Sequence, residues 1–323
     1  MSGIEKPAPN PTPRAKPKVP MPKDPDTLPA GKRAAYFATD LAARACIGTA
    51  LALPYRWRVP FMGWVFVNVI ARAAGFLRRA EDHITFVLPY LPRAEQERLA
   101  RASLNNAGRT LIENYSTKAL LARQKGAKLD GPGIEALEKA AAAGQPVVLV
   151  TGHFGNYEAV RAALVSRGYD VGGLYRDMAN PYFNAHYVRT MQAFGGPVFA
   201  KGRKGTAGFV RHLKGGGQLV LLFDQHVHGA PVLDFLGHKA HTAVSAAELA
   251  LRYDAPLIPF YGIRKSDGLS FDCVIEAPIP HTDAETMTQA MNDSISARIR
   301  AHPDQWLWVA RRWRDSANAA PKV

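Results

Sequence analysis

A chain of 323 residues, 47% of them hydrophobic, has a globular composition and can form one large domain or two small ones, which excludes a disordered protein. Its 41 lysines and arginines outnumber its 27 aspartates and glutamates, and the net charge of +14 favours a nucleic acid, an acidic protein or an anionic membrane surface as partner. The two cysteines, Cys46 and Cys273, lie far apart and outside any C-x-x-C arrangement, so the sequence suggests neither a disulfide framework nor a cysteine-based zinc site.

The N-terminal segment is rich in proline and lysine and has no apolar stretch of the kind that a secretory signal requires. We interpret residues 1–32 as a disordered basic tail, which either has no specific role or is weakly attracted to anionic lipid head groups. Residues 317–323 are predicted as a second tail.

Residues 33–80 are apolar and amphipathic, and we expect membrane-associating helices there. Their longest uncharged run has 13 residues, whereas a spanning helix needs about 20. Trp57 and Trp64 stand near Arg56 and Arg58, a mixture that suits the headgroup layer of a bilayer. A buried core helix could have the same residues, so the pattern alone leaves both interpretations open.

From residue 81 to residue 316 the sequence predicts an α/β domain. Residues 94–124 are predicted as amphipathic helix with one break. Beyond Gln145, short apolar runs alternate with helical stretches, which indicates a largely parallel or mixed central sheet flanked by helices. Strands are expected in PVVLVT, YDVGGLYR, PVFA, QLVLLF, APLIPFYGI and LSFDCVIEA, and helices in NYEAVRAALVSRG and residues 181–194, 205–214 and 283–300.

A histidine follows the first of these strands. In open α/β sheets, functional sites form at the carboxyl ends of the strands, and His153 lies at such an end between Gly152 and Gly155. Glu158 lies in the first turn of the next helix, and the chain can fold the two side chains toward each other. A carboxylate on one ring nitrogen raises the basicity of the other, so His153 is a candidate general base with Glu158 as its partner. A histidine so placed is, however, often only a satisfied polar group.

The strand QLVLLF ends at Asp224 and Gln225, which are expected at the same edge of the sheet as His153. Asp224 could orient a ligand, accept a hydrogen bond from an arginine, or cap the next element. Four histidines follow in spacings that match no established zinc pattern: His226, His228, His238 and His241. They keep open a metal-dependent hydrolase that uses these histidines and Asp224, although we expect no metal.

Basic residues are concentrated between these two strand ends. Arg176 ends one strand and Arg189 lies one helix later, where an arginine would bind a phosphate or stabilise an oxyanion. The stretch KGRKGTAGFVRHLK adds Lys201, Arg203 and Lys204, which would suit an acidic protein or a phosphate-bearing substrate. Such charges are also common on solvated helix faces, and a basic, non-enzymatic membrane-binding protein is the third interpretation.

Five sequence blocks, in order, resemble the late (secondary) acyltransferases of lipid A biosynthesis, the lauroyl and myristoyl transferase type, over residues 35–314. They are the H-x-x-x-x-E block from His153 to Glu158, Arg189 after an N-P pair, the D-Q pair Asp224 and Gln225, PVLDFLG at 231–237, and PDQWLWVARR near the end. The chain departs from the family pattern at His226, where an acidic or amide residue is usual, and at Ala310, where a histidine often precedes the paired arginines.

The resemblance implies an O-acyltransferase without a cofactor, on the cytoplasmic face of the inner (plasma) membrane, with no nucleic-acid partner. His153 would take the proton from a hydroxyl of a lipid A precursor, and Glu158 would orient His153. The hydroxyl would attack the thioester of an acyl carrier protein or of coenzyme A. Asp224 would position the site, and Arg189 would stabilise the oxyanion or hold a phosphate.

Further residues are expected to bind substrate in this scheme: Arg176, Asn156, Gln225, Lys201, Arg203 and Lys204. Because H-x-x-x-x-E/D also marks glycerolipid acyltransferases, the alternative acceptor is a lysophospholipid or another glycolipid.

Overall fold

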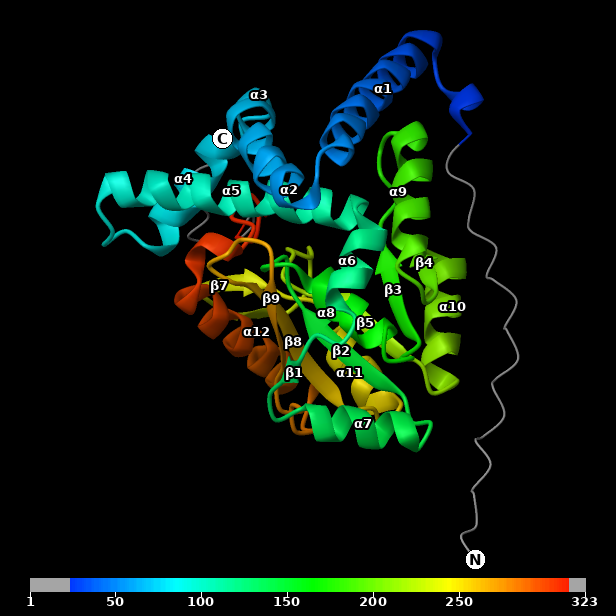
Figure 1. Ribbon diagram of the computed structural model, residues 1–323. Coiled ribbons are helices and arrows are strands. Elements are labelled where there is room, and N and C mark those ends of the chain that lie inside the picture. The colour runs from blue at the N-terminus through cyan, green and yellow to red at the C-terminus, as the bar shows by residue number, and fades with distance from the viewer. Residues whose placement is uncertain (1–23, 314–323) are drawn as a thin grey trace, which may run out of the picture.

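The computed structural model describes residues 24–313, and Figure 1 shows their arrangement. Most of the tail predicted over 1–32, and all of the tail predicted over 317–323, lies outside the described residues. A 3₁₀ turn forms at Pro25–Thr27 and the first helix begins at Ala30, so the last residues of the predicted N-terminal tail are helical.

The N-terminal part is helical and contains α1 (Ala30–Ala52), α2 (Tyr55–Val65), α3 (Ala71–Ala73), α4 (Phe76–Val87) and α5 (Arg93–Tyr115), with a π-helical turn, Phe66–Ile70, between α2 and α3. α1 ends because Leu53 precedes Pro54, and a residue before proline avoids the helical conformation; Leu53 is extended. In the described part of the chain, no single helix is long and apolar enough to cross a membrane. The helical segments 55–73 and 76–87 meet such a test only as a pair, bent by 92°.

The central sheet has seven strands in the order β1-β9-β8-β2-β5-β3-β4. They are β1 (Leu129–Asp130), β2 (Val147–Thr151), β3 (Val171–Tyr175), β4 (Val198–Ala200), β5 (Gln218–Leu222), β8 (Leu257–Arg264) and β9 (Phe271–Ile275). Only the β8–β9 pair is antiparallel, and the other neighbours are parallel. The predicted mixed and largely parallel sheet is therefore confirmed.

Helices cover both faces of the sheet (Figure 1). They are α6 (Thr117–Gln124), α7 (Ile134–Ala142), α8 (Tyr157–Val165), α9 (Pro181–Ala193), α10 (Arg203–Lys214), α11 (Ser245–Arg252) and α12 (Ala284–Ala301), and the hairpin β6 (Val232–Phe235) with β7 (His238–His241) forms a separate two-stranded sheet. Alternate residues of β2 enter two different cores: Val147 and Leu149 pack with α8, whereas Val148 and Val150 pack with α10, α11 and α12. A parallel strand covered on both faces reads as a continuous apolar run, which is why PVVLVT shows no alternation.

The register of the parallel strands brings distant parts of the chain together at one edge. Thr151 of β2 is paired with Leu222 of β5, so the two strands end side by side. His153 and Asp224 each follow two residues later. α5 closes this edge, where the Thr110 hydroxyl donates to the Gly155 carbonyl oxygen over 3.0 Å.

Candidate active site

His153 and Asp224 form a hydrogen-bonded pair at the carboxyl edge of the sheet. Nδ1 of His153 lies 2.8 Å from Oδ1 of Asp224, and the backbone N–H of His153 donates to Oδ2 over 2.7 Å. The indole N–H of Trp306 donates to the same Oδ2 over 2.9 Å. Because an ionised carboxylate only accepts, the contact assigns the ring proton to Nδ1 and leaves Nε2 as the basic nitrogen.

The surroundings of the pair favour an ionised Asp224 and a basic His153. Burial alone would raise the pKa of Asp224, but the nearby His153 and the hydrogen bonds from His153 and Trp306 bring the pKa below its ordinary value. Burial would lower the pKa of His153, but the Asp224 carboxylate raises it above the ordinary value. The Asp224 side chain is fully buried while that of His153 is 26% exposed, so only the histidine can reach a substrate.

Glu158 does not hold the position that the sequence suggested for it. Its carboxylate is fully buried and accepts a hydrogen bond from Nη1 of Arg161 over 3.0 Å. Arg161 in turn donates to the carbonyl oxygens of Val171 and Gly195. The expectation that Glu158 orients His153 is therefore corrected, since Asp224 binds the ring nitrogen. The cause is the register of β2 and β5, which delivers Asp224 to His153 from a neighbouring strand end.

A cavity of about 350 Å³ opens beside His153. Its polar wall includes Tyr157, Glu158 and Tyr187, and the apolar lining includes Met191 and Val198. Burial followed by the charge of Glu158 raises the pKa of Tyr187 to about 12. This phenol therefore stays protonated near neutrality and can donate a hydrogen bond. The cavity combines an accessible histidine, hydrogen-bond donors and apolar side chains, which suits an acyl group attached to a polar carrier.

The other residues expected to bind substrate fall into two groups. Arg176, Lys201 and Gln225 line the cavity and are exposed. Arg203 and Lys204 are exposed at the start of α10, and Arg189 is exposed on α9. These last three side chains lie outside the lining of the cavity, so the structure does not bring them to His153.

Asn156, also expected to bind substrate, is a buried structural residue. Its side chain caps α8 by accepting from the Glu158 N–H over 3.1 Å and donates to Glu113 over 2.9 Å. Glu113 is paired with Arg264 through both carboxylate oxygens, at 2.5 and 2.8 Å. The capping amide and this ion pair link α5, β8 and the start of α8. The sequence placed Asn156 near the site but could not show that its amide faces the protein interior.

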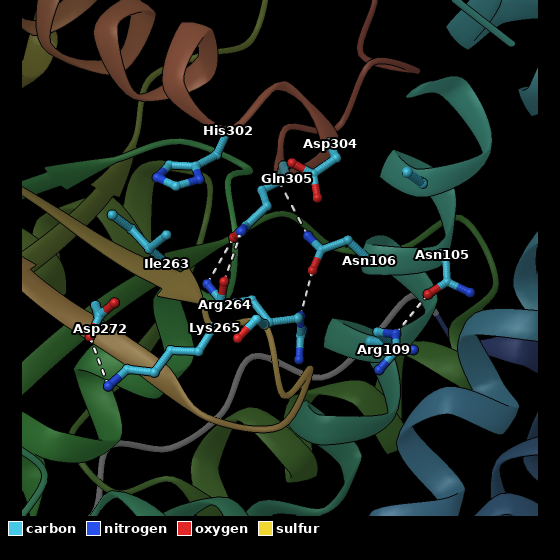
Figure 2. Close-up of a pocket in the computed structure, with 12 residues that line it drawn as sticks. Asn105, Asn106, Arg109, Ile263, Arg264, Lys265, Asp272, His302, Asp304 and Gln305 are labelled. Atoms are coloured by element: carbon cyan, nitrogen blue, oxygen red, sulfur yellow. Dashed lines mark hydrogen bonds and ion pairs between the residues drawn. The ribbon is translucent and has the colours of Figure 1, made fainter. Parts of the chain in front are cut away.

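A second cavity, of about 800 Å³, adjoins this network at the end of β8. Figure 2 shows that Asn106 and Gln305 bind each other and Arg264. The carbonyl oxygen of Gln305 also accepts from the Gly155 N–H over 2.9 Å. Gly155 has a φ of 54° and closely approaches Gly262, so a larger residue would collide there. The polar residues of the second cavity therefore hold the turn that carries His153.

Two histidines of the metal hypothesis, His226 and His241, lie with their ring centroids 5.4 Å apart, but no third ligand joins them among the described residues. His238 packs against Phe86, with ring centroids 4.1 Å apart, and Nδ1 of His241 contacts the Ala230 carbonyl oxygen at 2.6 Å. Across residues 24–313, no group of three or more His, Cys, Asp or Glu side chains is placed to hold a metal ion. The ligand set suggested by the sequence is therefore not assembled.

Trp306, Arg161 and Glu113 are functional or supporting residues that sequence reasoning missed. Residues 305–307 run alongside the His153 turn, with a bridge between Phe154 and Trp306 and a 3.0 Å hydrogen bond from Leu307 N–H to the His153 carbonyl oxygen. Trp306 lies in the PDQWLW block, but nothing in the sequence indicated that its indole binds Asp224.

Known proteins resemble this chain over most of its length. Residues 34–315 match the model of the bacterial lipid A biosynthesis acyltransferase family. A lipid A biosynthesis acyltransferase of Haemophilus influenzae is 21% identical over 81% of this chain and 83% of its own length. The lipid A biosynthesis lauroyltransferase of Escherichia coli K12 is 24% identical over 80% and 85%. A phosphatidylinositol mannoside acyltransferase of Mycobacterium tuberculosis is 24% identical over 70% and 74%.

Proposed function

The chain belongs to the bacterial lipid A biosynthesis acyltransferase family, and we propose that it moves a fatty acyl chain from a thioester to a hydroxyl of a lipid A precursor. The observation that carries the proposal is the His153–Asp224 pair, whose histidine lines a cavity that also has apolar side chains in its lining. The similarity to a phosphatidylinositol mannoside acyltransferase favours one further acceptor of the same chemistry, a different glycolipid.

In the proposed reaction, Nε2 of His153 takes the proton from the acceptor hydroxyl while the hydroxyl oxygen attacks the thioester carbonyl carbon. A carbon–oxygen bond forms, the carbon–sulfur bond breaks, and the leaving thiolate receives the proton from His153. Asp224 stabilises the imidazolium that exists between these two steps. Among the described residues, no serine or cysteine lines the cavity, which supports direct attack without a covalent acyl-enzyme.

Cationic side chains at the cavity supply the charge that the transition state needs. Arg176 and Lys201 both line the cavity. The backbone N–H of Lys201 donates to the Tyr175 carbonyl oxygen over 2.7 Å, and this bond holds the ends of β3 and β4 together. We assign Arg176 and Lys201 to the developing oxyanion or to a substrate phosphate. Arg189 is exposed on α9, outside the cavity lining, and would contact the donor at a distance from the reacting carbon.

The proposed donor is an acyl carrier protein, with coenzyme A as the alternative. Its docking is supported by the cationic rim, which we define as Arg176, Lys201, Arg203 and Lys204. All four side chains are exposed, and within the described part of the chain none forms an ion pair with a carboxylate. Unpaired cations next to the reactive cavity are suited to an acidic protein that delivers a thioester.

We also propose attachment to the cytoplasmic face of the inner membrane through the N-terminal helices. Large apolar side chains on α1, α2 and the following turn are each more than half exposed: Phe37, Leu41, Trp57, Trp64 and Val69. Arg56 stacks on Trp57, with the guanidinium 5.2 Å from the ring centre, and both are exposed. Tryptophan combined with arginine suits the interface between lipid head groups and acyl chains.

The proposal is tested by acyl transfer in vitro and in cells. Purified protein is incubated with a lipid A precursor and with acyl carrier protein or coenzyme A thioesters, and the product is identified by mass spectrometry. His153→Ala is expected to lower the transfer rate by roughly 10²-fold or more while the thermal unfolding temperature is retained. Wild-type activity in a folded His153→Ala protein would contradict the proposed mechanism. Unchanged lipid A and glycolipid masses in cells lacking the gene would count against both acceptors.

A further inference from the structure

A row of three residues crosses the sheet in the lining of the cavity. Gly173 of β3 is paired with Val198 of β4 on one side and with Val220 of β5 on the other. Paired residues of neighbouring strands point to the same face, and all three line the cavity that contains His153. Met191 of α9 lies among the lining residues and packs with Val198 in one apolar cluster. The wall is therefore valine, glycine, valine, with a notch at Gly173.

The notch is open space. A Cβ atom added to Gly173 would have no neighbouring atom within 4 Å. At the adjacent Gly172, which points to the other face, a Cβ would meet the His212 ring at 2.9 Å. Gly173 also lies in a regular strand and its φ is not positive, so no backbone strain requires glycine there. The missing side chain thus changes the room inside the cavity and leaves the packing of the sheet unaffected.

We propose that Gly173 is a specificity-determining residue, which sets the length of the acyl chain that the cavity accepts. The inference rests on the acyl transfer proposed above. The thioester carbon must lie beside the acceptor hydroxyl that His153 deprotonates, and from there we extend the acyl chain along the wall formed by Val198, Gly173 and Val220. A side chain at residue 173 would fill the notch and leave less room for the terminal methylenes. One methylene more or less in an apolar pocket changes selectivity by roughly 10-fold or more.

The test is a graded series: Gly173→Ala, Gly173→Val and Gly173→Leu. Each variant receives a mixture of saturated acyl carrier protein thioesters of several chain lengths and a lipid A precursor, and mass spectrometry gives the ratio of products. We expect the ratio to shift toward shorter chains in the order Ala, Val, Leu, by roughly 10-fold for each methylene excluded. The ratio is independent of the total amount of active protein. Alanine and valine also favour a strand more than glycine does, so the unfolding temperature should not fall.

Gly172→Ala is the control for stability, because it alters the same strand on the face away from the cavity, where its Cβ would press on the His212 ring. It is expected to keep the wild-type product ratio. A wild-type ratio in Gly173→Val and Gly173→Leu proteins that still transfer acyl chains would overturn the role of Gly173. A wild-type protein that transfers no chain from any thioester would instead contradict the proposed function. Should Gly173→Leu fail to fold, the alanine and valine variants decide the question.

Discussion

In the proposed mechanism, the Asp224 carboxylate influences the pH at which His153 can act as a base. Burial acts to lower the pKa of His153, but the Asp224 carboxylate raises it above its ordinary value of 6.5. A general base must be unprotonated, and a group with a raised pKa loses its proton only at higher pH. We therefore expect kcat/KM for acyl transfer to rise with pH through an apparent pKa above 6.5, measured from initial rates across a series of buffers.

Replacing the carboxylate separates the roles of Asp224 and Glu158. In Asp224→Asn the influence of burial remains while the carboxylate is lost, so the rise in kcat/KM should move to lower pH. The rate at the optimum should fall about 10²- to 10⁴-fold, since the imidazolium loses its partner. Glu158→Gln, which breaks the pair with Arg161, is the comparison and should keep the wild-type apparent pKa. A shift of the apparent pKa in Glu158→Gln and none in Asp224→Asn would show that Glu158, and not Asp224, is the partner of His153.

Candidate site residues that directly follow a strand were predictable from the sequence. His153 and Asp224 each follow a buried apolar run, and that local pattern brings them to one edge in any parallel sheet. The partner of His153 was not predictable in the same way, because Asp224 comes from a non-adjacent segment through the register of β2 with β5. Glu158, the nearer carboxylate in sequence, is buried and accepts a hydrogen bond from Arg161 instead. Sequence proximity therefore favoured the wrong carboxylate.

Elements with a strong period or a continuous apolar run were predictable, whereas two short helices were not. The broken helix expected at 94–124 is confirmed as α5 and α6, and the helix expected at 181–194 is confirmed as α9. α7 and α11, with nine and eight residues, were missed. Helices of this length are stabilised mainly by tertiary contacts, here through buried Leu137 and Ala247, so their local sequence carries little signal.

The exposed aromatic side chains of α2 provide a test of membrane attachment. Burying one such side chain contributes on the order of 1.5–3 kcal/mol, so losing two should weaken binding to vesicles by at least roughly 100-fold. We expect the full chain to sediment with vesicles of anionic and zwitterionic phospholipid, and Trp57→Ser with Trp64→Ser to remain largely in the supernatant.

Val232→Ser is the control for this pair, because Val232 is 52% exposed on β6, remote in sequence from the N-terminal helices. It should sediment like the wild type. Detergent is expected to release the wild-type protein more fully than concentrated salt, since salt screens charges but does not weaken apolar insertion. Complete release by salt alone would contradict insertion of the tryptophans.

The cations behind the net charge of +14 are not all available to bind a partner. Arg33, Arg93 and Arg98 are paired with carboxylates on the surface. The cationic rim is different, because within residues 24–313 its side chains have no carboxylate partner. Its residues directly follow β3 and β4 and begin α10, and these elements lie together at one end of the sheet (Figure 1). A charge concentrated at the entrance to a site accelerates the encounter with an oppositely charged partner more than the same charge spread over the surface.

Reversing the charge of part of the cationic rim should therefore weaken the binding of a protein-bound donor, while the chemical step is retained. Arg203→Glu with Lys204→Glu lies outside the cavity lining, and glutamate suits the first turn of α10, so stability should hold. We expect KM for acyl carrier protein thioesters to rise about 10-fold at low salt and the difference to shrink as salt is added, because screening acts on both proteins. A small neutral thioester should react as with the wild type. Lys128→Glu with Lys139→Glu changes the net charge equally near β1 and on α7, and an equal KM increase there would show that the rim has no special part in docking.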